Sequence, residues 1–149
     1  MKVLVTYQSK TGFTKKYAEW IARALSADLK DASGVDAAGL AGYDLVIHGG
    51  WIMGGLVSGL RKIMKCNPKK LIVFGVGFTA KGDMDAAACA TANQLGDIPF
   101  FYFEGGMNPE KMGWLGRIVV KKVTKKELAY ADHADPKAIE ALVTLAKGC

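Results

Sequence analysis

The residues from 9 to 14 combine hydroxyl side chains with a glycine, a pattern that suits an anion: Ser9, Lys10, Thr11, Gly12, Phe13 and Thr14. Gly12 lets the backbone curl, and a helix that begins near Thr14 would direct its first N–H groups and positive dipole end at this loop. With Thr14 as N-cap, the loop is predicted to bind a phosphate dianion. The residues alone leave a second interpretation open, an ordinary turn capped by Ser and Thr.

Two later segments, rich in glycine and aromatic residues, also offer ligand contacts. Trp51 and Phe78 each follow the end of a predicted strand, where an aromatic side chain is available to a ligand. The alternative for each is an aromatic residue of the core or its rim. The second segment consists of Gly50, Trp51, Ile52, Met53, Gly54 and Gly55, and the third of Gly77, Phe78, Thr79, Ala80, Lys81 and Gly82.

Short apolar runs alternate with segments of helical spacing, and these elements must position the three segments. Strands are predicted over 2–7, 28–32, 43–48, 70–77 and 99–104, and helices over 14–25, 56–64, 83–94 and 136–147. Such alternation predicts βαβ units, and so one three-layer α/β domain over 1–149 with a parallel sheet. Ligands of these sheets bind beyond the carboxyl ends of the strands, where all three segments are expected.

The composition indicates a single globular domain: 149 residues, 15.9 kDa and half the residues apolar. The longest apolar run, 71–78, is too short to cross a bilayer, and the N-terminus does not have the pattern of a signal peptide. Three widely spaced cysteines without a C-x-x-C pair argue against a disulfide framework and a thiolate zinc site. They fit a reducing cytosol, so a cytoplasmic location is expected.

The net charge of +6 is concentrated in residues 107–126, which hold six Lys and Arg and one acidic residue. No nucleic-acid-binding motif accompanies this stretch, so a nucleic-acid partner is not expected. The apolar residues of this stretch fall near one helical face, so a helix is predicted, and two interpretations of it are open. The helix is either solvated and packed on the sheet edge, or it is a docking surface for anionic lipid, a quinone-bearing membrane enzyme or a tetrapyrrole with propionates.

Other motifs are weaker. Residues 75–80 match the dinucleotide pattern G-x-G-x-x-[GA], but Gly75 lies inside a late strand, which disfavours NAD. The loop at 9–14 is not a G-x-x-x-x-G-K-[ST] sequence, which disfavours ATP or GTP chemistry. His48 is either a proton relay or a hydrogen-bonded histidine at the core rim. With His133 alone in the acidic tail, no metal site is predicted, and no side chain is predicted to be catalytic.

The order of these segments resembles the flavodoxin family over nearly the whole chain. The pattern [ST]-x-T-G-x-T at 9–14, directly after a first buried strand, looks like its FMN-phosphate loop. The resemblance implies a three-layer sandwich with a five-stranded parallel sheet of order 2-1-3-4-5, noncovalent FMN, and a flavin ring flanked by Trp51 and Phe78. It also implies a role for Gly54 and Gly55, either in a backbone flip beside the reduced ring or as a tight turn.

A subgroup of that family is similar in more detail: the flavodoxin-like, menaquinone-linked protoporphyrinogen oxidases. The similarity lies in Thr79–Lys81, in Phe103–Gly106 and in the basic stretch 114–122. Two features differ from these patterns. Met53 and Gly54 stand where the subgroup often has Arg and aromatic residues, and the chain is basic where many electron-carrier flavodoxins are acidic.

Three functions are therefore weighed. We expect an FMN-binding redox protein that transfers electrons to a partner protein. The alternative is a protoporphyrinogen-type dehydrogenase with FMN and a quinone acceptor. The third is an interaction module that keeps the fold without flavin.

Overall fold

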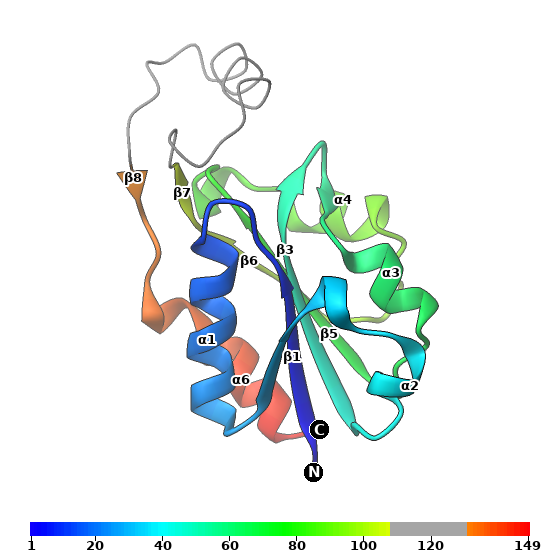
Figure 1. The fold of residues 1–149 in the computed structure, drawn as a ribbon. Helices are drawn as coiled ribbons and strands as arrows, with labels where there is room; N and C mark the ends of the chain where they lie inside the picture. The colour runs from blue at the N-terminus through cyan, green and yellow to red at the C-terminus, as the bar shows by residue number, and fades with distance from the viewer. Residues whose placement is uncertain (108–130) are drawn as a thin grey trace.

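The computed structural model describes residues 1–107 and 131–149 (Figure 1). The predicted basic stretch at 107–126 lies, apart from Met107, outside the described residues. The five main strands are β1 (Val3–Gln8), β2 (Asp28–Asp31), β3 (Leu45–Met53), β5 (Leu71–Gly77) and β6 (Phe100–Glu104). Three two-residue strands accompany them: β4 (Leu56–Val57), β7 (Gly106–Met107) and β8 (Ala131–Asp132).

The α-helices are α1 (Phe13–Leu25), α2 (Ala37–Leu40), α3 (Leu60–Lys65), α4 (Ala86–Ala92) and α6 (Glu140–Lys147). Short 3₁₀ helices are η1 (Ala32–Gly34), η2 (Lys81–Asp83) and η3 (Pro136–Ile139). The side chain of Asp135 caps η3 by accepting a hydrogen bond from the backbone N–H of Lys137.

The main strands pair in parallel in the order β2-β1-β3-β5-β6, which confirms the predicted order 2-1-3-4-5. β4 adds an antiparallel pair to the end of β3, which the sequence did not predict. β7 and β8 form a separate two-stranded sheet. β3 and β5 are buried along most of their length, and apart from His48 they consist of apolar residues and glycine with little alternation.

Two apolar clusters cover the two faces of the sheet, and each is built on helical spacing. The first packs α1 and α6 against β1, β3 and β5, with Tyr17, Ile21 and Leu142 fully buried. The second packs α2 and α3 on the opposite face, around Leu40, Ile63 and Val46. Figure 1 shows α1 and α6 on one side of the sheet and α2, α3 and α4 on the other.

Several predicted boundaries differ from the structure, and the helix predicted over 136–147 is split into η3 and α6. The helix predicted over 56–64 begins only at Leu60, because Leu56 and Val57 form β4. The helix predicted over 83–94 is shorter, with Asp85 capping α4 through the backbone N–H of Ala88. The strand predicted over 43–48 continues to Met53. Within the described residues, no helix is both long enough and apolar enough to span a bilayer.

Candidate functional site

The three predicted ligand segments leave the sheet at one edge. Strand register places Gln8 beside Gly50, Trp51 beside Val76, and Gly77 beside Glu104. These are the carboxyl ends of β1, β3, β5 and β6, which gather at the top of Figure 1, away from the two termini. The parallel order therefore brings together segments that lie up to about 70 residues apart in the chain.

The first segment, residues 9–14, turns into α1 at Gly12, whose φ of 98° lies in the left-handed region. A residue with a Cβ is strained in that conformation, so glycine is needed here. Gly12 donates its N–H to Ser9 Oγ at 3.1 Å, which folds the serine side chain across the turn. The backbone N–H groups at the start of α1 face the end of this loop, and the first turn of α1 holds no acidic residue.

The prediction that Thr14 is the N-cap of this helix is wrong. Gly12 holds the N-cap position, and Thr14 is the second residue of α1, only 2% exposed. The helix begins earlier because Phe13 is buried in the first apolar cluster and anchors the first turn. Ser9 and Thr11 are half-buried, whereas Lys10 is exposed.

The second segment forms a tight β-hairpin at the end of β3. Met53 pairs with Leu56 and Ile52 with Val57, so Gly54 and Gly55 alone make the turn. Their φ values of 59° and 81° fit a two-residue type I′ turn, which needs positive φ at both positions. The structure thus shows a tight turn at Gly54 and Gly55, and the backbone flip beside a reduced ring stays a prediction.

Helix α4 fixes this hairpin from the side. The side-chain amide of Asn93, the residue after α4, donates to Gly55 O at 2.8 Å, and its Oδ1 accepts from Val57 N at 2.9 Å. The Cys89 thiol donates to Gly55 O at 3.1 Å. Burial raises the pKa of that thiol, which keeps it protonated and able to donate. The hairpin is therefore held to α4 as well as to β3.

The third segment is fixed by β6. Tyr102 donates its hydroxyl to Thr79 O at 2.5 Å, and Glu104 Oε1 accepts from Lys81 N at 2.6 Å. Gly105 donates its N–H to Gly77 O at 2.7 Å. Burial raises the pKa of Tyr102 to about 12, so the phenol remains a donor at neutral pH. Phe78 is 45% exposed, an unusual amount for a phenylalanine.

A hollow of about 450 Å³ lies between the hairpin and the third segment, with α4 as its third wall. Its volume is in the range of small-molecule sites. The predicted site residues that line it are Ile52, Gly54, Gly55, Gly77, Phe78 and Thr79. Residues 9–14 and Gly50, Trp51, Met53, Ala80, Lys81 and Gly82 do not line it.

Trp51 lies on the other face of β3 from Ile52, because side chains alternate along a strand. Its backbone is held by Ser58 from both sides: Trp51 N donates to Ser58 Oγ, and Trp51 O accepts from Ser58 N, each at 3.0 Å. The alternation places Trp51 on the α1 side of the sheet, the side to which the first segment leads. Trp51 and Phe78 therefore approach the edge from different directions.

His48 is a buried core residue in this structure. It is 0% exposed and bonded at both ring nitrogens, to Thr6 Oγ1 and to Ser58 O. Burial lowers its pKa to about 4, so the ring is neutral at physiological pH. Of the two interpretations that the sequence left open, the structure supports the hydrogen-bonded core histidine.

Sequence reasoning missed Ser58, Asn93 and Tyr102, which hold the second and third ligand segments without belonging to them. One signal was available: Gly54-Gly55 between apolar residues is typical of a two-residue hairpin, which needs support from a neighbouring element. Nothing in the sequence pairs Asn93 with that hairpin. Among residues 1–107 and 131–149, no cluster of three or more His, Cys, Asp or Glu side chains could hold a metal ion.

The sheet order, the phosphate-type loop and the hollow between the second and third segments define the class of doubly wound α/β proteins that bind a nucleotide or flavin at the sheet edge. The chain belongs to the flavodoxin family, since the family model described as "Flavodoxin domain" matches residues 4–133. Membership supports FMN, the cofactor expected from the sequence.

Solved structures share the fold at low identity. A flavodoxin from the domain Archaea is 18% identical, with a TM-score of 0.53 over 84% of this chain and 98% of that one. A flavoprotein in complex with FMN from Lactobacillus acidophilus NCFM is 18% identical, with a TM-score of 0.50 over 69% and 92%. The flavodiiron core from Synechocystis sp. PCC6803 is 14% identical, with a TM-score of 0.54 over 74% of this chain. The match spans only 32% of that core's length. No curated protein matches the chain.

Proposed function

We propose that the chain binds FMN noncovalently at the carboxyl edge of its sheet and serves as an electron-transfer flavoprotein. The observation that carries the proposal is the meeting of three segments there: a hydroxyl-lined loop at a helix start, a glycine hairpin and an aromatic loop. A mononucleotide with a planar ring needs these three kinds of contact.

The first segment fits a phosphate group. Gly12 has a left-handed backbone conformation and no side chain, which leaves the turn open to an anion. The first turn of α1 holds no carboxylate that would repel the anion. The hydroxyls of Ser9, Thr11 and Thr14 and the N–H groups of the first turn supply donors without requiring a cation. Lys10 is exposed beside the loop and adds a positive charge.

The second and third segments fit a ring. In the proposal, Phe78 packs against one face and Trp51 lies at the other, while the backbone of Gly54 and Gly55 meets the polar edge. The exposed Phe78 would gain a partner on binding. FMN, when bound, supplies reversible uptake of electrons. The chain positions the ring, excludes water from part of it and sets its electrostatic surroundings.

Three titratable groups line the hollow, and each is engaged in holding the fold: Asp85 caps α4 by accepting from the backbone N–H of Ala88, and Tyr102 and Cys89 donate to backbone oxygens. Tyr102 stays protonated because its pKa is about 12, and its hydroxyl is committed to Thr79 O. The Cys89 thiol is buried, and burial raises its pKa. This favours a protein that passes electrons over one that performs acid–base catalysis.

A second candidate is the protoporphyrinogen-type dehydrogenase with a quinone acceptor. One contact favours it: two segments that carry the resemblance to that subgroup touch each other, through Lys81 N and Glu104 Oε1 at 2.6 Å. The exposed Lys81 side chain beside the hollow offers a positive charge to a propionate. The basic stretch of the resemblance lies outside the described residues.

FMN titration tests the first proposal. The purified protein should be yellow or should take up FMN with a shift in flavin absorbance. The double variant Thr11→Val, Thr14→Val should weaken binding on the order of 100-fold, because two hydrogen bonds to a charged group are lost. The matched variant Thr91→Val, Thr144→Val changes two exposed threonines elsewhere and should leave the affinity unchanged. Colourless protein that takes up no FMN would instead favour the flavin-free module.

The second candidate is tested with anaerobic protoporphyrinogen and a menaquinone analogue. FMN-dependent oxidation that is lost on charge reversal at Lys121 and Lys122 would support the dehydrogenase. A flavin whose oxidation state responds to neither compound would exclude it and leave the electron carrier.

A further inference from the structure

The positive charge of the described residues is concentrated on α3 and the turn after it. Residues 60–70 hold five Lys and Arg and no acidic residue, whereas the rest of 1–106 holds seven Lys and Arg and nine Asp and Glu. Arg61 and Lys65 are exposed, and neither pairs with a carboxylate of the described residues. Helix α3 therefore presents a basic surface without neutralising carboxylates, whereas the rest of residues 1–106 carries a slight excess of acidic residues.

A groove of about 400 Å³ runs between α3 and the end of α4 beside these charges. Leu56, Leu60 and Met64 contribute its apolar lining, and Arg61 and Lys65 stand at its rim. Leu56 is 52% exposed although it is a large apolar residue in a strand. We call these five residues the α3 groove. An apolar floor with a charged rim has the anatomy of a protein interface, in which the rim selects the partner.

The α3 groove adjoins the proposed flavin site. Leu56 and Val57 form one wall of the groove, while Gly54 and Gly55 of the same hairpin line the 450 Å³ hollow. Ala92 lines both spaces, and Asn93, which lines the groove, is bonded to Gly55 O. A partner seated in the groove would therefore lie against the hairpin that forms the wall of the flavin site.

We propose that the α3 groove docks an acidic electron-transfer protein, whose apolar residue enters between α3 and α4 while its carboxylates meet Arg61 and Lys65. This rests on the proposed function for the redox character of the partner. Because Arg61 and Lys65 are positively charged, charge complementarity favours a partner with a negatively charged surface. The apolar lining is recessed between α3 and the end of α4, a shape that suits a protruding side chain of a protein better than a flat lipid surface.

The test uses the full chain and a plant-type [2Fe–2S] ferredoxin as the acidic probe, with cytochrome c as a basic probe of similar size. Nuclear magnetic resonance titration of the ¹⁵N-labelled chain at low salt should shift the amides of Leu56, Arg61 and Met64 with ferredoxin and not with cytochrome c. Binding should weaken steeply as salt rises. Arg61→Glu, Lys65→Glu should weaken the ferredoxin affinity on the order of tenfold or more.

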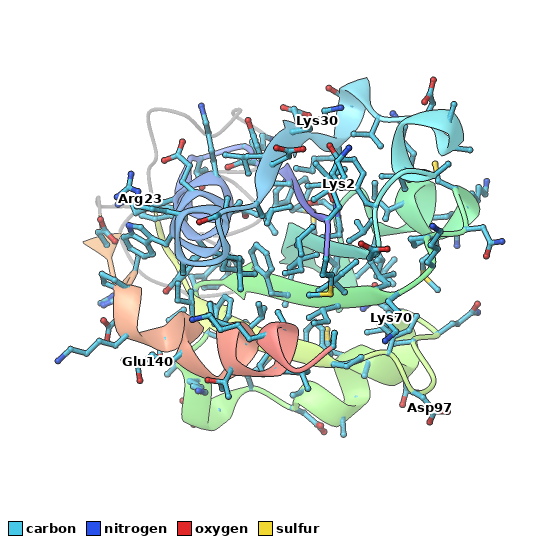
Figure 2. All side chains as sticks on the ribbon, turned by 90° about the horizontal axis from the view of Figure 1, so that it is seen from below. Lys2, Arg23, Lys30, Lys70, Asp97 and Glu140 are labelled. Carbon is cyan, nitrogen blue, oxygen red and sulfur yellow. The ribbon has the colours of Figure 1, made fainter. Side chains whose placement is uncertain are left out.

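The matched control is Arg23→Glu, Lys30→Glu, which makes the same change in net charge. Figure 2 labels both residues, which lie on α1 and β2 and not on α3. This variant should change the affinity less than about threefold, since distant exposed charges are screened. An equal loss in both variants would show general attraction to a basic protein and would overturn the proposal, as would shifts that avoid the groove.

Two further arms separate the remaining outcomes. Binding to phosphatidylserine–phosphatidylcholine vesicles without binding to ferredoxin would replace the protein partner with a membrane and overturn the proposal. FMN uptake is measured on the same samples by absorbance. Uptake without ferredoxin binding refutes the docking surface alone, whereas ferredoxin binding without FMN uptake refutes the proposed function alone.

Discussion

His48 Nε2 lies 2.9 Å from the backbone oxygen of Ser58, and that contact links the core of the sheet to the segment that holds Trp51. A carbonyl only accepts, so Nε2 carries the proton. The other nitrogen, Nδ1, then accepts from the hydroxyl of Thr6 on β1 at 2.9 Å. Because the Thr6 hydroxyl can either donate or accept, burial, and not the partners, is what keeps the ring neutral.

This arrangement predicts acid-sensitive stability. The pKa of His48 is about 4 in the folded protein and near 6.5 when unfolded, so between these values the unfolded chain binds more protons. The free energy of unfolding should be constant above about pH 6.5 and should fall by up to about 3 kcal/mol as the pH drops toward 4. Urea unfolding across that range measures it.

His48→Gln supplies the comparison. The amide can donate to Ser58 O, so the variant should fold, but it should lose most of the pH dependence between 4 and 6.5. Stability at pH 7 should fall by about 1–3 kcal/mol, because a fitted buried ring is replaced. A variant that keeps the full acid transition would show that other groups cause it.

The Asn93 amide is predicted to hold the glycine hairpin in place. Asn93→Asp keeps the oxygen that accepts from Val57 N but removes both N–H donors, one of which bonds Gly55 O. We expect a loss of about 1–3 kcal/mol in unfolding free energy. FMN affinity should fall as well, since Gly55 lines the hollow. Thr91→Val, two residues earlier in the chain and exposed, should change neither quantity.

Gly50 is predicted to tolerate no side chain. A Cβ there would lie 2.2 Å from Ser58 O, a backbone atom that is held by His48 and cannot move cheaply. Gly50→Ala should lower the melting temperature and destabilise the fold by about 2 kcal/mol or more. Gly42→Ala meets no atom within 4 Å and should shift stability by less than about 0.5 kcal/mol.

Tyr102 gives an alkaline prediction. Its pKa is raised to about 12 in the folded protein, against about 10 for the phenol in the unfolded chain. The contribution of Tyr102 to the free energy of unfolding is therefore fully present below pH 10 and is lost as the pH rises toward 12. Absorbance titration of the phenolates should show one tyrosine fewer ionising near pH 12 in Tyr102→Phe. The variant should also exchange the amide protons of residues 79–82 faster, because Thr79 O loses its donor.

The sequence predicted the parallel sheet because strands buried on both faces consist of apolar runs, and this pattern does not depend on which strands lie beside them. β1, β5 and β6 appear within one residue or two of the predicted bounds. It was wrong at Leu56 and Val57, where a helix was predicted. Their helical spacing with Leu60 is real, but the glycine turn at 54 and 55 folds them back onto β3. Pairing with a strand already in place overrides local propensity.

The sequence by itself determined which residues make up the three ligand segments. Hydroxyl, glycine and aromatic residues directly follow predicted strands, and these residue types can be recognised without knowing how the chain folds. Only the tertiary structure decided how those segments are held. Asn93 and Tyr102 come from other elements, and their bonds to Gly55 and Thr79 depend on how the chain crosses over. The α3 groove likewise exists only because the fold brings α3 and the end of α4 to opposite sides of one space, which no spacing within either helix encodes.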